Sequence, residues 1–202
     1  MLVIGLCGGS GSGKGEVSHR FLKHGIPSLD TDKIYRELVS QPGDCLNELV
    51  AAFGGDILLE DGSLNRKKLA LIVFCGDEAR SKKKLLESIT HKHILNRVRS
   101  ELQRYAKEER PPAVIVDAPL LFESKFDKEC NIVIAVLCDR DTRIARIIKR
   151  DGISEPEAKR RIDAQITDEE LKARADFTIT NDKYHDLDAQ INEIANNILR
   201  RR

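Results

Sequence analysis

One glycine-rich segment near the start of the chain limits the possible folds more than any other feature. Residues 8–14 read Gly-Gly-Ser-Gly-Ser-Gly-Lys and match the pattern G-x-x-x-x-G-K. A short apolar run, Leu2–Cys7, precedes them, and a segment with helical spacing through Val17 and Phe21 follows. A strand, a glycine-rich turn and a helix in this order surround a phosphate with backbone N–H groups. The sequence therefore predicts a phosphate-binding loop in an α/β fold.

Each residue of this loop has a predicted part in holding ATP. The glycines let the backbone turn with positive φ, and Lys14 brings a full charge to the β- and γ-phosphates. Gly15 stands where a Ser or Thr would offer a hydroxyl to Mg²⁺, and Glu16 adds a negative charge. The other reading is a glycine-rich turn that binds no ligand. The nucleotide-binding residues predicted here are Gly9, Ser10, Gly11, Ser12, Gly13, Lys14, Gly15 and Glu16.

Strand and helix patterns alternate along the rest of the chain. Four further apolar runs predict strands at residues 26–30, 113–117, 132–137 and 177–180. One helix is predicted to begin near Thr31, which can serve as its N-cap. Further helical patterns lie at residues 46–74, 78–109 and 187–199. This alternation predicts a parallel sheet with helices on both faces.

Composition excludes several classes of protein. The 34 basic and 33 acidic residues give a net charge of +1, which argues against a broad nucleic-acid surface. The five cysteines are scattered, form no C-x-x-C pair, and suit reduced thiols in the cytoplasm. The first residues resemble a strand more than a signal peptide, and no apolar run approaches the roughly 20 residues that span a membrane. A cytoplasmic protein without nucleic-acid or membrane partners is expected; the oligomeric state is not readable.

Carboxylates and arginines at strand and helix ends are candidates for the chemistry. Asp32 follows the second predicted strand, at the sheet edge where such folds bind ligands, although it could instead cap the next helix. Asp117 ends another strand, where a carboxylate could hold a metal-bound water or simply bond loop N–H groups. Arg143, Arg146 and Arg150 are spaced so that they share one helix face. This face could contact phosphates, or it could simply be the solvated side of a charged helix.

Six segments together resemble the dephospho-coenzyme A kinase family in order and spacing, over nearly the whole chain. They are residues 8–14, 29–32, 61–66, 117–123, 146–151 and 175–181. The resemblance implies transfer of the γ-phosphoryl group of ATP, with Mg²⁺, to the ribose 3′-hydroxyl of dephospho-coenzyme A, the last step of coenzyme A synthesis. It also implies an α/β P-loop core (about 1–40, 111–140 and 175–202), a helical acceptor-binding insertion (about 41–110) and a small lid (about 141–174). We expect the lid to close over the phosphates because its charged residues have little apolar surface to bury.

The resemblance also implies roles for single residues. Asp32 would take the hydroxyl proton, with Lys14 and Arg146 as further catalytic residues, and Asp32 and Asp117 would hold a metal through water. Two positions depart from the family pattern: Gly15-Glu16 replaces Ser-Thr, and Lys92 replaces a proline. The remaining implied contacts are Arg146, Arg150 and Asn181 to ATP, and Asp32, Arg66, His91, Leu120, Leu121 and Glu123 to the acceptor.

Two other functions stay open at this point. Gly-Lys-Gly at the end of the loop is also found in adenylate kinases, so another nucleoside or nucleotide kinase is a second hypothesis. The missing hydroxyl at position 15 motivates a third, a nucleotide-binding regulatory protein that has lost catalysis. The segments at 29–32 and 117–123 favour the first hypothesis.

Overall fold

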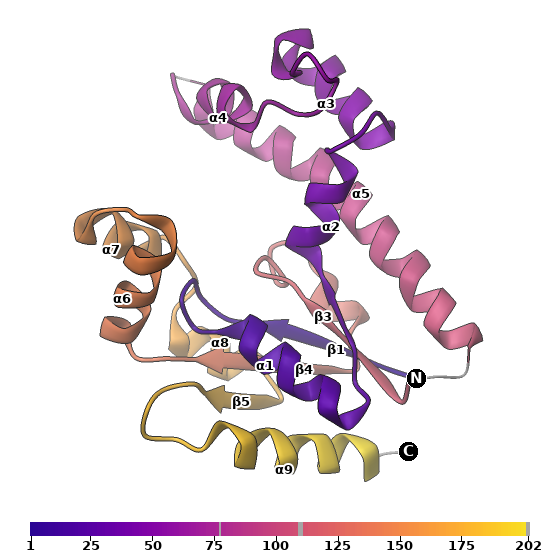
Figure 1. Cartoon of the computed structure of the whole chain (residues 1–202), viewed down its shortest axis with the longest axis vertical. Helices are drawn as coiled ribbons and strands as arrows, with labels where there is room; N and C mark the ends of the chain where they lie inside the picture. The colour runs from indigo at the N-terminus through magenta and orange to yellow at the C-terminus, as the bar shows by residue number, and fades with distance from the viewer. Residues whose placement is uncertain (77, 109–110, 201–202) are drawn as a thin grey trace. The chain divides into compact units, whose positions relative to one another are not determined.

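A computed structural model describes residues 1–76, 78–108 and 111–200, and its centre is a five-stranded parallel sheet (Figure 1). The strands lie in the order β2-β3-β1-β4-β5, and every neighbouring pair is parallel. Apolar β-branched residues dominate the central strands, as expected for strands buried on both faces. Their bounds are β1 Leu2–Cys7, β2 Ser28–Asp30, β3 Ala113–Asp117, β4 Ile132–Leu137 and β5 Phe177–Thr180.

The register brings two acidic strand ends together. Asp30 at the end of β2 is the Cα partner of Asp117 at the end of β3, and Leu6 near the end of β1 also pairs with Asp117. Parallel strands end at one edge of the sheet, so the glycine-rich loop that follows β1 starts at the same edge.

The chain forms two compact units, one of residues 1–30 and 102–202, the other of residues 31–101. The boundary falls inside one long helix, α5 (Ala79–Lys107). The sequence-based division has three parts with assigned functions, namely a core, an acceptor-binding part and a lid. These two units do not test those functions, so that division remains a prediction.

Helices cover both faces of the sheet in the first unit (Figure 1). On one face α1 (Lys14–Phe21) and α9 (Leu187–Arg200) bury Val17, Phe21 and Ile191 against Ile4 and the alternate residues of the strands. On the other face lie α8 (Asp168–Arg174) and the short helix η3 (Phe126–Glu129). The predicted α/β fold with a parallel, doubly covered sheet is confirmed.

The second unit is helical and has a separate apolar core. It contains α2 (Thr31–Leu38), α3 (Asp44–Phe53), the short helix η2 (Gly55–Ile57), α4 (Arg66–Phe74) and most of α5. α5 continues unbroken through Lys92, where a proline would remove a backbone donor. Its core residues are Val39, Cys45, Leu46, Leu49, Ile57, Leu64, Leu69, Val73 and Ile89.

The charged segment after β4 folds into α6 (Arg140–Asp151), α7 (Glu155–Asp163) and α8. Apolar residues lie three or four apart within α6 and within α7, so Ile144 and Ile147 meet Ala158 and Ile162 in a small apolar cluster. The expectation that this segment has little apolar surface to bury was therefore wrong. Its proposed closure over phosphates needs other support.

Local details differ from the sequence-based expectations at two strand and helix ends. The strand predicted from residue 26 begins at Ser28 in the structure. The Ile26 N–H donates to the Phe21 carbonyl at the end of α1, and Pro27 has no N–H that could donate to a neighbouring strand. Thr31 is the first residue of α2 and not a cap before it. The last residue of the helix predicted at 78–109 lies outside the described residues. Within the described chain, no helix has the length and apolar character needed to cross a membrane.

Candidate active site

The glycine-rich loop closes on itself and then starts α1. Gly13 adopts a left-handed conformation with φ 89°, and Lys14 is the first helical residue. Inside the loop the Ser12 N–H donates to the Gly9 carbonyl at 3.1 Å, and the Lys14 ammonium donates to the Gly8 carbonyl at 3.2 Å. The first N–H groups of a helix have no intrahelical acceptors and carry partial positive charge, so this end of α1 attracts anions.

Side chains from distant segments hold the carbonyl groups of this loop. The Arg143 guanidinium donates to the Ser10 carbonyl at 3.0 Å, and Arg146 donates to the Gly11 and Ser12 carbonyls at 3.1 and 3.3 Å. The Asn181 amide donates to the Ser12 carbonyl at 2.9 Å. These carbonyl groups are thus bound by cationic and amide donors.

Two of the loop glycines leave room for these same side chains. A Cβ placed on Gly9 would lie 2.0 Å from Nη2 of Arg143, and one on Gly13 would lie 2.1 Å from Nδ2 of Asn181. Gly13 has a positive φ as well. Gly9 is therefore needed for the packing of Arg143, and Gly13 both for the packing of Asn181 and for the turn of the loop.

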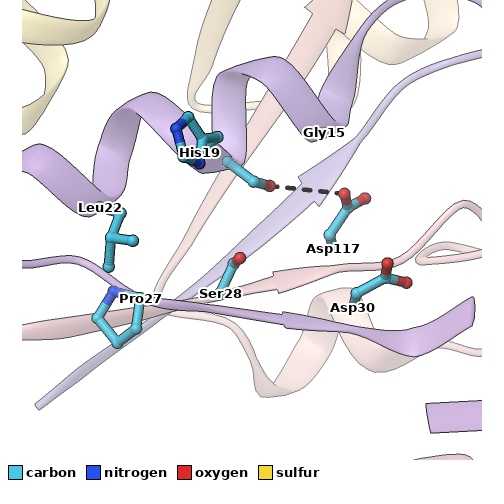
Figure 2. Close-up of a pocket in the computed structure, with 8 residues that line it drawn as sticks. Gly15, His19, Leu22, Pro27, Ser28, Asp30 and Asp117 are labelled. Atoms are coloured by element: carbon cyan, nitrogen blue, oxygen red, sulfur yellow. Dashed lines mark hydrogen bonds between the residues drawn. The ribbon is translucent and has the colours of Figure 1, made fainter. Parts of the chain in front are cut away.

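A pocket of about 400 Å³ lies along α1, from Gly15 to Leu22 just past its end (Figure 2). Both acidic strand ends, Asp30 and Asp117, contribute carboxylates to it, and the Ser18 hydroxyl donates to Asp117 at 3.5 Å. A Cβ added to Gly15 would meet nothing within 4 Å, so the missing hydroxyl leaves open space. The full lining is Gly15, Ser18, His19, Leu22, Pro27, Ser28, Asp30 and Asp117.

This pocket suits a hydrated magnesium ion. Its side chains include two carboxylates and two serine hydroxyls beside the His19 imidazole, and oxygen atoms are the ligands that Mg²⁺ takes. The space at Gly15 can admit water, which Mg²⁺ usually retains when it is bound with nucleotide phosphates. Among the described residues, no group of three or more His, Cys, Asp or Glu side chains could hold a metal.

Glu16 has a partner of its own. Its carboxylate accepts from the Arg20 side chain at 2.7 Å, one turn further along α1, and Arg20 also contacts Asp188 at 2.8 Å. The two carboxylates raise the pKa of Arg20. A carboxylate close to a phosphate is repelled by it, so Glu16 must either point away from the phosphates or act through Mg²⁺. Its contact with Arg20 accords with the first alternative.

Arg150, the third arginine of the predicted face, has acidic and basic neighbours at the end of α6. It makes a two-pronged contact with Asp151, at 2.7 and 2.9 Å, and Arg161 binds the same carboxylate. The two guanidinium groups, that of Arg150 foremost, lower the pKa of Asp151 to about 2. Arg143 and Arg146 of the predicted face thus reach the loop, and binding of ATP by Arg150 stays a prediction.

Several predicted acceptor residues lie in the second unit. Asp32 is exposed in the first turn of α2, and the Arg66 guanidinium lies 5.9 Å from the ring centre of Tyr35. His91 is half-buried on α5. Their roles toward an acceptor remain predictions.

The other predicted acceptor residues follow β3 in the first unit. Leu120 and Glu123 are exposed, whereas Leu121 is completely buried and fills the space above Gly5. Between them the ring of Phe122 faces the Arg174 guanidinium of α8 at 4.3 Å. The segment of residues 120–123 therefore contacts the end of the predicted lid, and acceptor binding by these side chains is still untested.

Sequence reasoning missed residues that the structure brings into this region. Gln165, between α7 and α8, contacts Ser10 through both its oxygen and its nitrogen. Ser18 faces Asp117. Separately, within the second unit, His93 of α5 contacts Glu48 at 2.7 Å, which sequence reasoning also missed. Helical spacing could have placed Ser18 one turn after Gly15, but no local signal marks Gln165.

Comparisons with known proteins agree over most of the chain. A family model described as dephospho-CoA kinase matches residues 2–186. A dephospho-CoA kinase of Bacillus cereus is 40% identical over 181 residues, covering 90% of this chain and 88% of the relative. One of Arabidopsis thaliana is 37% identical over 182 residues, covering 90% and 76%. A solved dephospho-CoA kinase from Campylobacter jejuni has a TM-score of 0.71 and 28% identity, covering 98% of this chain and 97% of that one.

Proposed function

The chain belongs to the dephospho-CoA kinase family, and we propose that it transfers the γ-phosphoryl group of ATP to the ribose 3′-hydroxyl of dephospho-CoA. The products are CoA and ADP, and the reaction completes CoA synthesis. The observation that carries this proposal is a family match over residues 2–186 that includes a phosphate loop formed at the start of α1. Neither the other nucleotide kinases nor a regulatory protein is favoured by any of these relatives.

Phosphoryl transfer requires charge neutralisation and positioning more than covalent chemistry. The N-terminus of α1 and Lys14 would hold the β- and γ-phosphates. Arg146 would add charge beside Gly11 and Ser12, where its guanidinium already lies. Asp32, exposed in the first turn of α2, would accept the proton of the acceptor hydroxyl.

Magnesium is the metal we propose for this reaction, because the pocket beside Gly15 offers oxygen donors and room for water. When bound with ATP, the ion supplies charge neutralisation at the phosphate oxygens. Asp117 would orient a metal-bound water from the end of β3, with Ser18 holding the carboxylate. Asp32 is a second candidate for such a water contact.

A cytoplasmic site of action is a further part of the proposal. It is supported by the five cysteines, all of which are free thiols in the structure. Burial raises the pKa of Cys7 and of Cys130 to about 12, so these two thiols would resist oxidation.

A coupled ADP-release assay tests the acceptor. The purified protein with Mg²⁺ and ATP would be given dephospho-CoA, adenosine or AMP in parallel, with ATP alone as the background. Fast turnover with dephospho-CoA only is expected. ADP release that depends on AMP or adenosine would show that the protein is another nucleoside or nucleotide kinase. If no acceptor raises ADP release above the background, a regulatory protein would be favoured.

A further inference from the structure

Ser10 is tied to the 140–168 segment through all three of its polar groups. Its N–H donates to Oε1 of Gln165 at 2.9 Å, and its hydroxyl lies 3.2 Å from Nε2 of the same side chain. Its carbonyl accepts from Nε of Arg143 at 3.0 Å. A loop residue with every polar group bound to one distant segment cannot turn its peptide without breaking several bonds.

Gln165 also fixes the arginine. Its Oε1 accepts a second hydrogen bond, from Nη2 of Arg143 at 3.0 Å, and Asp168 lies 3.4 Å from Nη1. The Arg143 side chain is only 7% exposed, so its charge depends on these partners. Because the same guanidinium fills the space over Gly9, moving Gln165 would also change the packing of the loop.

The position of Ser10 in the loop decides what this contact can do. The N–H groups at the start of α1, which attract phosphate, begin with Lys14, and Ser10 lies four residues before it. The hydrogen bond from the Ser10 N–H to Gln165 therefore anchors the loop at a point before the helix. Holding it there orders the backbone that leads into the phosphate-binding end of the helix.

We propose that Gln165 is a positioning residue that couples the 140–168 segment to the phosphate loop. By holding the Ser10 peptide and the Arg143 guanidinium together, it prepares the loop for ATP while this segment is docked. Loss of the contact leaves the loop free to adopt conformations that bind ATP poorly, so ATP affinity falls while the transfer step is retained. This inference depends on the proposed function only in that the loop binds ATP.

The test compares Gln165→Ala with Gln165→Glu and with Gln103→Ala, the same truncation at an exposed position of α5. Gln165→Ala should raise the Kd and KM for ATP about tenfold, since each lost hydrogen bond has a modest net effect. The kcat at saturating ATP should stay within about twofold, because the chemical step is unchanged. Gln103→Ala should behave as the unsubstituted protein.

Amide exchange of Ser10 in the nucleotide-free protein, followed by NMR, supplies a readout independent of activity. Protection of this amide should be lost in Gln165→Ala and retained in Gln165→Glu, whose carboxylate can still accept from Ser10 and Arg143. If Gln165→Ala fails to fold, Ser10→Ala is used, and it should weaken ATP binding about twofold by losing the hydroxyl contact alone.

Equal ATP affinity in Gln165→Ala and Gln103→Ala would overturn the inference, as would a fall in kcat with unchanged KM. Unchanged Ser10 protection in Gln165→Ala would overturn it as well. Failure of the proposed function is distinguishable, because it would appear as absence of dephospho-CoA turnover in the unsubstituted protein while the Ser10 amide of the free protein remains protected.

Discussion

The ATP side and the acceptor side of this kinase are built in different ways. The phosphate loop in the first unit is held by Arg143, Arg146 and Asn181, which all donate to its carbonyls. The proposed acceptor residues Asp32 and His91 lie in the second unit, on helices around a separate apolar core. The ATP side is thus ordered in advance by hydrogen bonds, whereas on the acceptor side a single exposed carboxylate has the proposed chemical role. Substitutions on the two sides should therefore change different measured quantities.

The largest expected effect is on turnover, from Asp32→Asn. The amide keeps the size and most hydrogen bonding of the carboxylate but cannot take the hydroxyl proton, so kcat should fall by roughly 10² to 10⁴. The Kd for ATP should be unchanged, since the loop is not altered. If the variant keeps more than half of the original turnover, Asp32 is not the catalytic base and has only a structural role at the start of α2.

The second largest effect should be on ATP affinity, from Gly13→Ala. The added Cβ would lie 2.1 Å from the Asn181 amide at a φ of +89°, so both strain and displacement are expected. Backbone strain of this kind costs about 1–3 kcal/mol, and we expect ATP binding to weaken about tenfold or more.

Gly25→Ala is the matched control for this substitution. Gly25 also has a positive φ, +71°, but a Cβ there meets nothing within 4 Å. It should lower the melting temperature without changing ATP affinity. If the two variants bind ATP equally, the packing of Asn181 against the loop is irrelevant to its function.

A smaller effect, in the opposite direction, should follow from restoring the missing hydroxyls with Gly15→Ser and Glu16→Thr. There is space for the serine at position 15, and removing Glu16 removes a negative charge from the first helical turn. Binding of Mg-ATP should tighten a few-fold by calorimetry, with the fold intact. Weaker binding would show that the Gly15-Glu16 pair is adapted to the metal.

The smallest effect should be confined to the second unit, from Glu48→Gln. Hydrogen bonds from Lys92, and then from His93, lower the pKa of Glu48 in the folded protein. A lowered pKa stabilises the fold above the ordinary glutamate value of about 4.3, and this stabilisation is lost as pH falls through the folded value. The variant should therefore melt slightly earlier at pH 7, and the difference should disappear in acid. A change in ATP affinity would mean that the two sides are not separable in this way.

Much of the ATP side could be predicted from the sequence because its signals are local. The loop follows an apolar strand directly, and the runs at 113–117 and 132–137 have the β-branched composition of buried parallel strands. Gln165 could not be found in this way, since it is 155 residues from Ser10 and nothing in its neighbourhood marks it. The apolar cluster that contains Ile144 and Ile162 was not predicted, because charged residues outnumber apolar ones in the sequence between its members.

The acceptor side was less predictable for a related reason. The family pattern favours His91 at the acceptor, which stays a prediction, and it gives no sign of the close contact between His93 and Glu48 of another helix. Which face of α5 meets α3 depends on packing inside the second unit, and two histidines two residues apart point to different faces. Likewise, no sequence signal shows that the Leu121 side chain fills the space above Gly5, and its role toward the acceptor stays a prediction.

The central claim is that dephospho-CoA receives the phosphoryl group, and the identity of the product tests it most directly. Dephospho-CoA, ATP and Mg²⁺ would be incubated with the protein, and the product separated by chromatography and analysed by mass spectrometry. We predict a product that carries one added phosphate and is identical to CoA in mass and retention, with one ADP formed for each molecule. Unchanged dephospho-CoA in the presence of ADP, or phosphate on a position other than the 3′-hydroxyl, would contradict the account.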